Sequence, residues 1–328
     1  MKTRAALLCP ALFGLVAVSV LLGGSEPPVH NALREAPSPI VVDFSSIVVA
    51  GPEHEPDPEV QEAMEHHAAE LRAEREAKDQ LIDGLPAAYA SAVGGMTVSY
   101  DPGHAAPSSV RAVVDAAVDQ WDSVIATNGS GPIVVEVYWS SLGNPNLLGY
   151  AGPDGMFQGG GLPTSALYPA ALTNTLLGID ANGASRPEIQ VVLNAELLAD
   201  NRWYLGTTGT PPSGKIDLYS VVLHEVGHGL GFLGSATVPN GQSDPSLNST
   251  PYIYDTLASY GETPLPSIGN QAQALRSGDL HSHVSDGLDY ELYAPSGWVS
   301  GSSFSHFDEG LYPGGSAGAL SLIHISEP

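Results

Sequence analysis

Apolar residues follow recognisable strand and helix periods only from about residue 91 onward. Alternating or continuous apolar runs predict strands at residues 96–100, 133–139, 147–151 and 188–194. We expect the third strand to be short and at a sheet edge, and the fourth to be buried because its apolar run is nearly continuous. Between the first two strands, residues 107–127 carry apolar side chains at helical spacing, and Ser108 or Ser109 can cap this helix.

A second helix is predicted from Leu218 to about Gly229, because Asp217 is a good N-cap ahead of an apolar run. The resulting order of a strand, a helix, three strands and a second helix indicates an α+β fold. We expect this folded domain to extend over residues 91–319.

The N-terminus has the pattern of a secretory signal peptide. Lys2 and Arg4 precede an apolar run from Ala5 to Leu22, and we expect residues 1–24 to be removed. A retained membrane anchor is the alternative, because the run is nearly long enough to span a bilayer. The single cysteine, Cys9, lies in this segment, so the mature chain would have no disulfide and no thiolate zinc ligand. We therefore expect a secreted, extracellular protein that is free of the membrane after cleavage.

Residues 25–90 differ in composition from the rest of the chain. Residues 53–83 are strongly acidic with a thin apolar stripe, which indicates an acidic pro-segment or linker that is helical or disordered. His66 and His67 lie on this charged segment, and a solvated face explains them better than a metal site. The net charge of the whole chain is -25, which argues against a nucleic-acid partner because phosphate binding needs basic patches.

The candidate chemistry lies in the second helix, in the string His224-Glu225-Val226-Gly227-His228. Residues four apart lie on the same face of a helix, so His224 and His228 could share one metal ion. Glu225 would then sit beside that ion. This is the HExxH arrangement of zinc hydrolases. Catalytic zinc keeps three protein ligands and one open position, so a third ligand must lie elsewhere.

Two glycines narrow the search for the third ligand. Gly231 allows the helix to end or bend three residues after His228, because glycine tolerates positive φ. In metzincin proteases a histidine or aspartate ligand follows three residues later, and here that position is Gly234. The remaining candidates lie downstream and are His281, His283, His306, Asp255, Glu262, Asp308 and Glu309.

The segment Ser305-His306-Phe307-Asp308-Glu309, taken with His224-Glu225-Val226-Gly227-His228-Gly229-Leu230-Gly231-Phe232, resembles the leishmanolysin-type branch of the metzincins, closest to its secreted bacterial relatives. The resemblance covers about residues 96–319. It implies a zincin/metzincin-like domain with a twisted mixed sheet, Zn2+ as cofactor, and His306 as the third ligand beside His224 and His228. Apart from the resemblance, two interpretations of Asp308 stay open: it could hold a ligand histidine, or it could be a solvated loop carboxylate.

By the same resemblance, the chain is expected to be a secreted zinc-dependent endopeptidase with protein or peptide substrates. A metal-activated water would attack the peptide carbonyl, and Glu225 would act as the general base.

A metzincin also has a methionine turn soon after the third histidine, and none is found in this sequence. Residues 320–328 match one reading frame of a common transposase sequencing adapter. We therefore expect a non-native tail there, and a natural gene that continues after Ala319. A chain truncated in this way could be inactive.

Three other interpretations fit the same residues. The chain could be a secreted zinc-binding adhesion protein or a degenerate protease without catalysis. It could be a gluzincin-like peptidase whose third ligand is a carboxylate such as Glu262. The second helix could also be an ordinary core helix with buried histidines.

Overall fold

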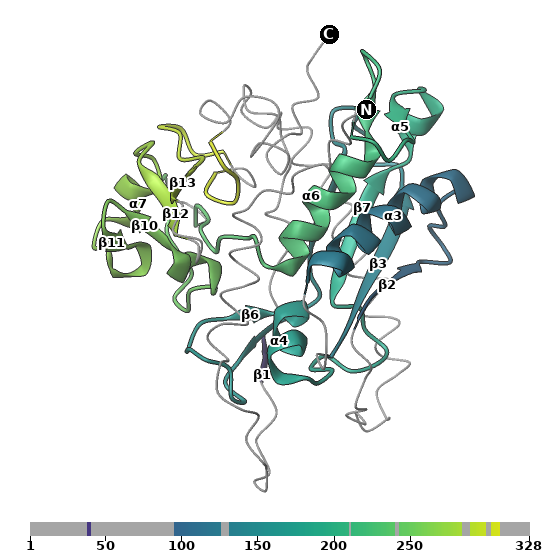
Figure 1. The fold of residues 1–328 in the computed structure, drawn as a ribbon. Coiled ribbons are helices and arrows are strands. Elements are labelled where there is room, and N and C mark those ends of the chain that lie inside the picture. Colours follow the sequence, from purple (N-terminus) through teal and green to yellow (C-terminus); the bar gives the residue numbers. More distant parts are fainter. Residues whose placement is uncertain are drawn as a thin grey trace, which may run out of the picture.

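The computed structural model describes residues 38–40, 95–125, 131–209, 211–239, 243–283, 289–299 and 303–308. Its main sheet is mixed and has four strands, and it lies on the right in Figure 1 with the two longest helices. Its strands are β2 (Gly95–Tyr100), β3 (Pro132–Ser140), β7 (Ile189–Asn194) and β4 (Gly149–Pro153), in that order across the sheet. The first three are parallel, and β4 runs antiparallel to β7 at one edge. The α+β class, the presence of four strands, the edge position of the third and the burial of the fourth are confirmed, but the third strand begins and ends two residues later than predicted.

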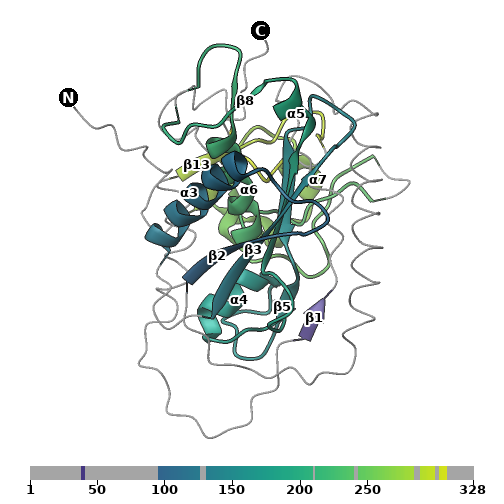
Figure 2. The ribbon, with the colours of Figure 1, turned by 90° about the vertical axis from the view of Figure 1, so that its right-hand side faces the viewer.

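Two long helices, α3 (Ser108–Val124) and α6 (Leu218–Leu230), pack against each other and against the sheet. Figure 2 shows them side by side along the strands. Helix α3 contacts β2, and α6 contacts β4 and β7. The indole Nε1 of Trp121 donates a hydrogen bond to the carbonyl of Leu223 at 3.0 Å, so α3 also fixes the backbone beside the predicted metal-binding residues.

The ends of α3 differ from the prediction. Pro107 occupies the N-cap, with φ -59° and no side-chain cap hydrogen bond, so the expected cap by Ser108 or Ser109 is wrong. The proline ring itself restricts φ to a value that suits the start of a helix, and the two exposed serines already belong to the first turn. The helix stops before the predicted residue 127, because Ile125 is already extended.

A smaller sheet lies at the end of the main sheet near α4 (Ala170–Leu177) (Figure 1). It contains β5 (Met156–Gln158), β6 (Tyr168–Pro169) and β1 (Ser38–Ile40), with β5 in the middle. Strand β1 comes from the segment predicted to be a pro-segment or linker, and it pairs antiparallel with β5. The predicted signal peptide and the acidic run lie outside the described residues.

The C-terminal part, which is the described residues from 258 to 308, contains an antiparallel sheet. This sheet lies on the side of α6 away from the main sheet (Figure 1). Its strands, in spatial order, are β11 (Thr263–Pro264), β10 (Ala258–Tyr260), β12 (Leu280–His283) and β13 (Asp289–Leu292). The remaining elements are short: α5 (Glu196–Ala199), β8 (Trp203–Tyr204), β9 (Ile216–Asp217), η2 (Tyr254–Leu257), η3 (Leu265–Ser267) and α7 (Gln271–Ala274). The largest buried apolar cluster includes side chains from α3, α6, the main sheet and this C-terminal part. In the part of the chain that is described, no helix has both the length and the apolar character needed to cross a bilayer.

Candidate metal centre

Helix α6 carries the sequence from His224 to His228 and buries it. The exposed fraction is 3% for His224, 0% for Glu225 and 1% for His228. The helix ends as the sequence predicts, at Gly231, whose φ is 118°. An L-residue with a side chain rarely adopts that angle, so glycine is required for the sharp exit of the chain.

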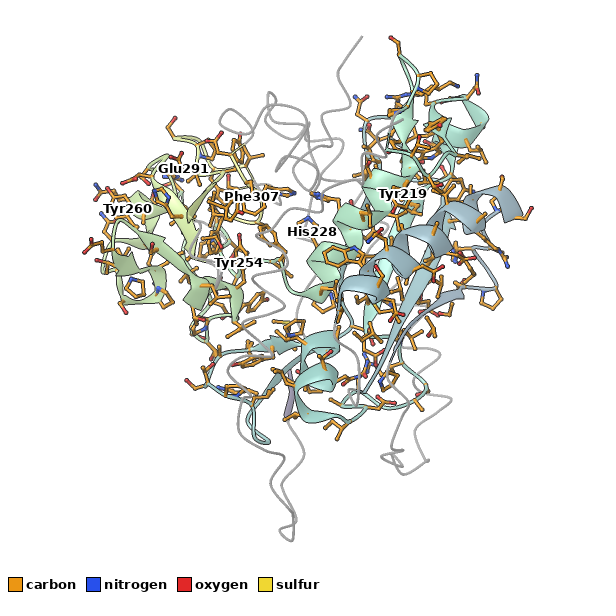
Figure 3. All side chains as sticks on the ribbon, viewed as in Figure 1. Tyr219, His228, Tyr254, Tyr260, Glu291 and Phe307 are labelled. Atoms are coloured by element: carbon orange, nitrogen blue, oxygen red, sulfur yellow. The ribbon has the colours of Figure 1, made fainter. Side chains whose placement is uncertain are left out.

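His306 joins the two helix histidines. The Nε2 atoms of His224 and His228 are 2.9 Å apart, and those of His224 and His306 are 3.1 Å apart. Together the three residues form a group that could hold a metal ion. Figure 3 shows His228 on the side of α6 that faces the C-terminal part, where Phe307 lies.

The ring nitrogens that can carry protons in this group fit a bound cation better than a network of hydrogen bonds among the three rings. Nδ1 of His228 lies 2.7 Å from the carbonyl oxygen of Phe232, so it must carry the proton and donate it. Burial, with a smaller contribution from the charge of His306, lowers the pKa of His228 to about 3. Its Nε2 therefore presents a lone pair to the centre of the group. His224 Nε2 can carry one proton at most, so it cannot donate to both neighbours.

The spacing of the nitrogens is also close to that of zinc ligands. Nitrogens about 2.0–2.1 Å from a tetrahedral zinc lie about 3.3 Å from one another. The observed separations of 2.9 and 3.1 Å need only a small outward movement of the rings. A donor set of three imidazole nitrogens is one that zinc accepts.

Glu225 directly follows His224 on α6. It is completely buried, and neither carboxylate oxygen has a hydrogen-bond partner among the residues that the structure describes. Burial alone raises the pKa of its carboxyl to about 8. A buried carboxylate without a donor is costly unless a positive charge lies nearby. A cation held by the three histidines would supply that charge.

The segment that carries His306 is fixed by backbone hydrogen bonds to the chain at and after β13. The N–H of Tyr293 donates to the carbonyl of His306 at 2.8 Å, and the N–H of Phe304 donates to the carbonyl of Tyr293 at 2.7 Å. The N–H of Asp308 donates to the carbonyl of Glu291 at 3.0 Å. The third histidine is thus attached to the C-terminal sheet on both of its sides.

An aromatic cluster then joins this segment to the end of α6. The ring of Phe232 packs against Tyr254 and Phe307, with centroids 4.9 and 5.0 Å apart. Tyr254 contacts Phe304, and Tyr290 contacts Phe307. Phe304 and Phe307 flank Ser305 and His306 in the sequence and are almost completely buried. Burial of this aromatic pair therefore brings His306 to the face of α6 that carries His224 and His228.

The other predicted ligands lie elsewhere. Glu262 is exposed between β10 and β11, and Nε2 of His281 lies 3.1 Å from a carboxylate oxygen of Asp279. Asp255 is buried, but it accepts hydrogen bonds from the backbone and hydroxyl of Ser235 and from the backbone of Tyr252, and burial raises its pKa to about 6. None of these three joins the described histidine group.

Several predictions about the site stay predictions. His283 lies on β12, and its side chain is not described. The role of the Asp308 carboxylate beside a ligand histidine is another of these predictions. Three further predictions fall outside the described residues. They concern Glu309, the methionine turn expected after the third histidine, and the pair His66 and His67.

Comparison with known proteins finds no match for this chain. No family model matches this chain, and neither does any curated protein or solved structure. The leishmanolysin-type resemblance therefore stays a prediction from the sequence, and the functional argument depends on the geometry of the histidine group.

Proposed function

We propose that this chain is a secreted zinc-dependent endopeptidase of the metzincin type. The observation that carries the proposal is the convergence of three buried imidazole Nε2 atoms. It is joined by the burial of the next residue after His224, Glu225, whose carboxylate has no described hydrogen-bond partner. An ordinary core helix gains nothing from burying three histidines and a glutamate together, because each polar group loses its contacts with water.

His224, His228 and His306 would hold the zinc. When bound, zinc supplies a Lewis acid that polarises a peptide carbonyl and lowers the pKa of water towards neutrality. Glu225 would accept a proton from the attacking water while the oxygen of that water bonds to the carbonyl carbon. The same carboxyl group would then give the proton to the leaving amine nitrogen as the peptide C–N bond breaks.

The test measures bound zinc and peptidase activity separately. Glu225→Gln should keep the zinc stoichiometry of the parent and reduce the turnover of a casein-type substrate, by about 10²–10⁴-fold for the loss of a general base. His306→Ala should lose zinc, whereas Glu262→Gln, a change at an exposed carboxylate outside the histidine group, should alter neither quantity.

The results separate this proposal from the alternatives. Turnover by Glu225→Gln equal to that of the parent would refute the assigned role. A zinc-loaded but inactive parent would favour a zinc-binding protein without catalysis. Loss of zinc in Glu262→Gln but not in His306→Ala would favour a carboxylate as the third ligand, and a zinc-free parent would favour a core helix.

A further inference from the structure

Gly234 touches the segment that carries the third histidine. Its backbone N–H donates to the hydroxyl of Ser305 at 3.0 Å, across 71 positions of sequence. Ser305 is buried and directly precedes His306. The chain that leaves α6 is therefore tied to the neighbour of a candidate ligand by one side-chain hydrogen bond.

Position 234 also has no room for a side chain. A Cβ atom at this position would lie 2.2 Å from Cδ1 and 2.3 Å from Cε1 of Phe304. These distances are far shorter than carbon–carbon contacts in proteins, so a side chain here requires the ring to move. The backbone angle of Gly234 is not the reason for glycine, because its φ lies outside the left-handed range.

Phe304 has little freedom to give way. Its side chain is 0% exposed, and its backbone is left-handed with φ 74°, which is uncommon for a residue with a bulky side chain. The hydroxyl of Tyr254 donates to its carbonyl at 2.9 Å, and its own N–H donates to the carbonyl of Tyr293 at 2.7 Å. A displaced ring would have to shift the backbone that leads into His306.

We propose that Gly234 is a positioning residue for the third metal ligand. It admits the ring of Phe304 and donates to Ser305, and these two contacts hold His306 so that its Nε2 meets that of His224. The inference rests on the proposed metal site. It also gives a reason for glycine at position 234, where a compact metzincin would carry its third ligand. Here that position supports a ligand that comes from a distant part of the chain.

The test is the affinity of the full chain for Zn2+, together with the visible spectrum of the Co2+-loaded protein. Gly234→Ala should weaken Zn2+ binding about 10–100-fold, the usual cost of a change just outside the ligands. It should also alter the Co2+ absorption bands, because His306 would no longer complete the ligand set. The matched control is Gly269→Ala, since an added Cβ there meets nothing within 4 Å.

Ser305 provides a second pair of variants that leaves the packing of Phe304 unchanged. Ser305→Ala removes the acceptor of the Gly234 N–H and should weaken Zn2+ binding, whereas Ser305→Thr keeps a hydroxyl and should restore it. In a Phe304→Ala background, Gly234→Ala should have little further effect, because the ring that it would strike is absent.

The outcomes distinguish this inference from the proposed function. If Gly234→Ala and Ser305→Ala keep the Zn2+ affinity and Co2+ spectrum of the parent while His306→Ala loses both, the positioning role is wrong and the metal site stands. If the parent binds neither ion, the proposed function fails, and the inference fails with it.

Discussion

Replacing Gly229 with alanine tests how tightly α6 is packed against the main sheet. Gly229 follows His228, and a Cβ there would lie 2.2 Å from Cγ2, 2.9 Å from Cγ1 and 3.0 Å from Cβ of Ile189. Ile189 is completely buried at the start of β7. Rotation of the isoleucine side chain cannot relieve the contact, because its Cβ is also too close.

Two opposing effects decide the sign of the change. Alanine is favoured over glycine within a helix by about 1 kcal/mol. Overpacking a filled core costs about 1–3 kcal/mol, and carbon atoms in contact normally lie about 3.5–4.0 Å apart. The closest approach at Gly229 is far below that range, so we place the cost at the upper end. The expected net result of Gly229→Ala is a loss of about 1–2 kcal/mol in the free energy of unfolding.

The assay is urea unfolding of the full chain, followed by circular dichroism in the presence of a chelator, so that metal binding does not contribute. Ile189→Ala should be destabilising alone, by about 2–5 kcal/mol, but the double variant should lose less than the sum of the two changes. A Gly229→Ala protein that is as stable as its parent, or more stable, would refute the packing argument, and so would strict additivity.

Two further predictions concern buried polar groups. Trp121→Phe loses the hydrogen bond to Leu223 and part of a buried ring, and we expect urea unfolding to show a loss of about 2–3 kcal/mol; an unchanged midpoint would contradict this. Burial raises the pKa of Glu188 from 4.5 to about 7, so the folded chain binds the proton more tightly than the unfolded chain. The contribution of Glu188 to the free energy of unfolding should therefore fall by about 3 kcal/mol as the pH rises from below 4.5 to above 7. Glu188→Gln should remove this contribution, so parallel plots of unfolding free energy against pH for the parent and the variant would count against the prediction.

The main sheet was predictable because its burial follows the period of the sequence. In β3, Ile133, Val135 and Val137 alternate with less buried residues, which is the pattern of a strand in a sheet. The C-terminal sheet lacked such a signal, because β10 and β11 contain three and two residues and include serine, threonine and proline. Helix α4 was missed although a signal existed: a mostly apolar run ends at Gly178, whose φ is 65°.

The candidate site divides in the same way. His224 and His228 followed from local spacing on one helix, which a sequence displays directly. The place of His306 followed only from a family resemblance, because it depends on the burial of Phe304 and Phe307 against distant elements. The steric need for Gly234 was not visible at all, since the ring that it admits is about 70 positions away in the chain.

Three histidines drawn from two distant parts of the chain would make a bound ion a cross-link. His224 and His306 are 82 positions apart. Closing a loop of that length restricts the unfolded chain by an amount worth about 4–5 kcal/mol, if the relation for disulfides is applied. The single cysteine, Cys9, lies in the predicted signal peptide, and one cysteine cannot form an intramolecular disulfide. A bound ion would then be a cross-link in a chain that cannot form an intramolecular disulfide, and its removal would open a ring of the polypeptide as well as disable the site.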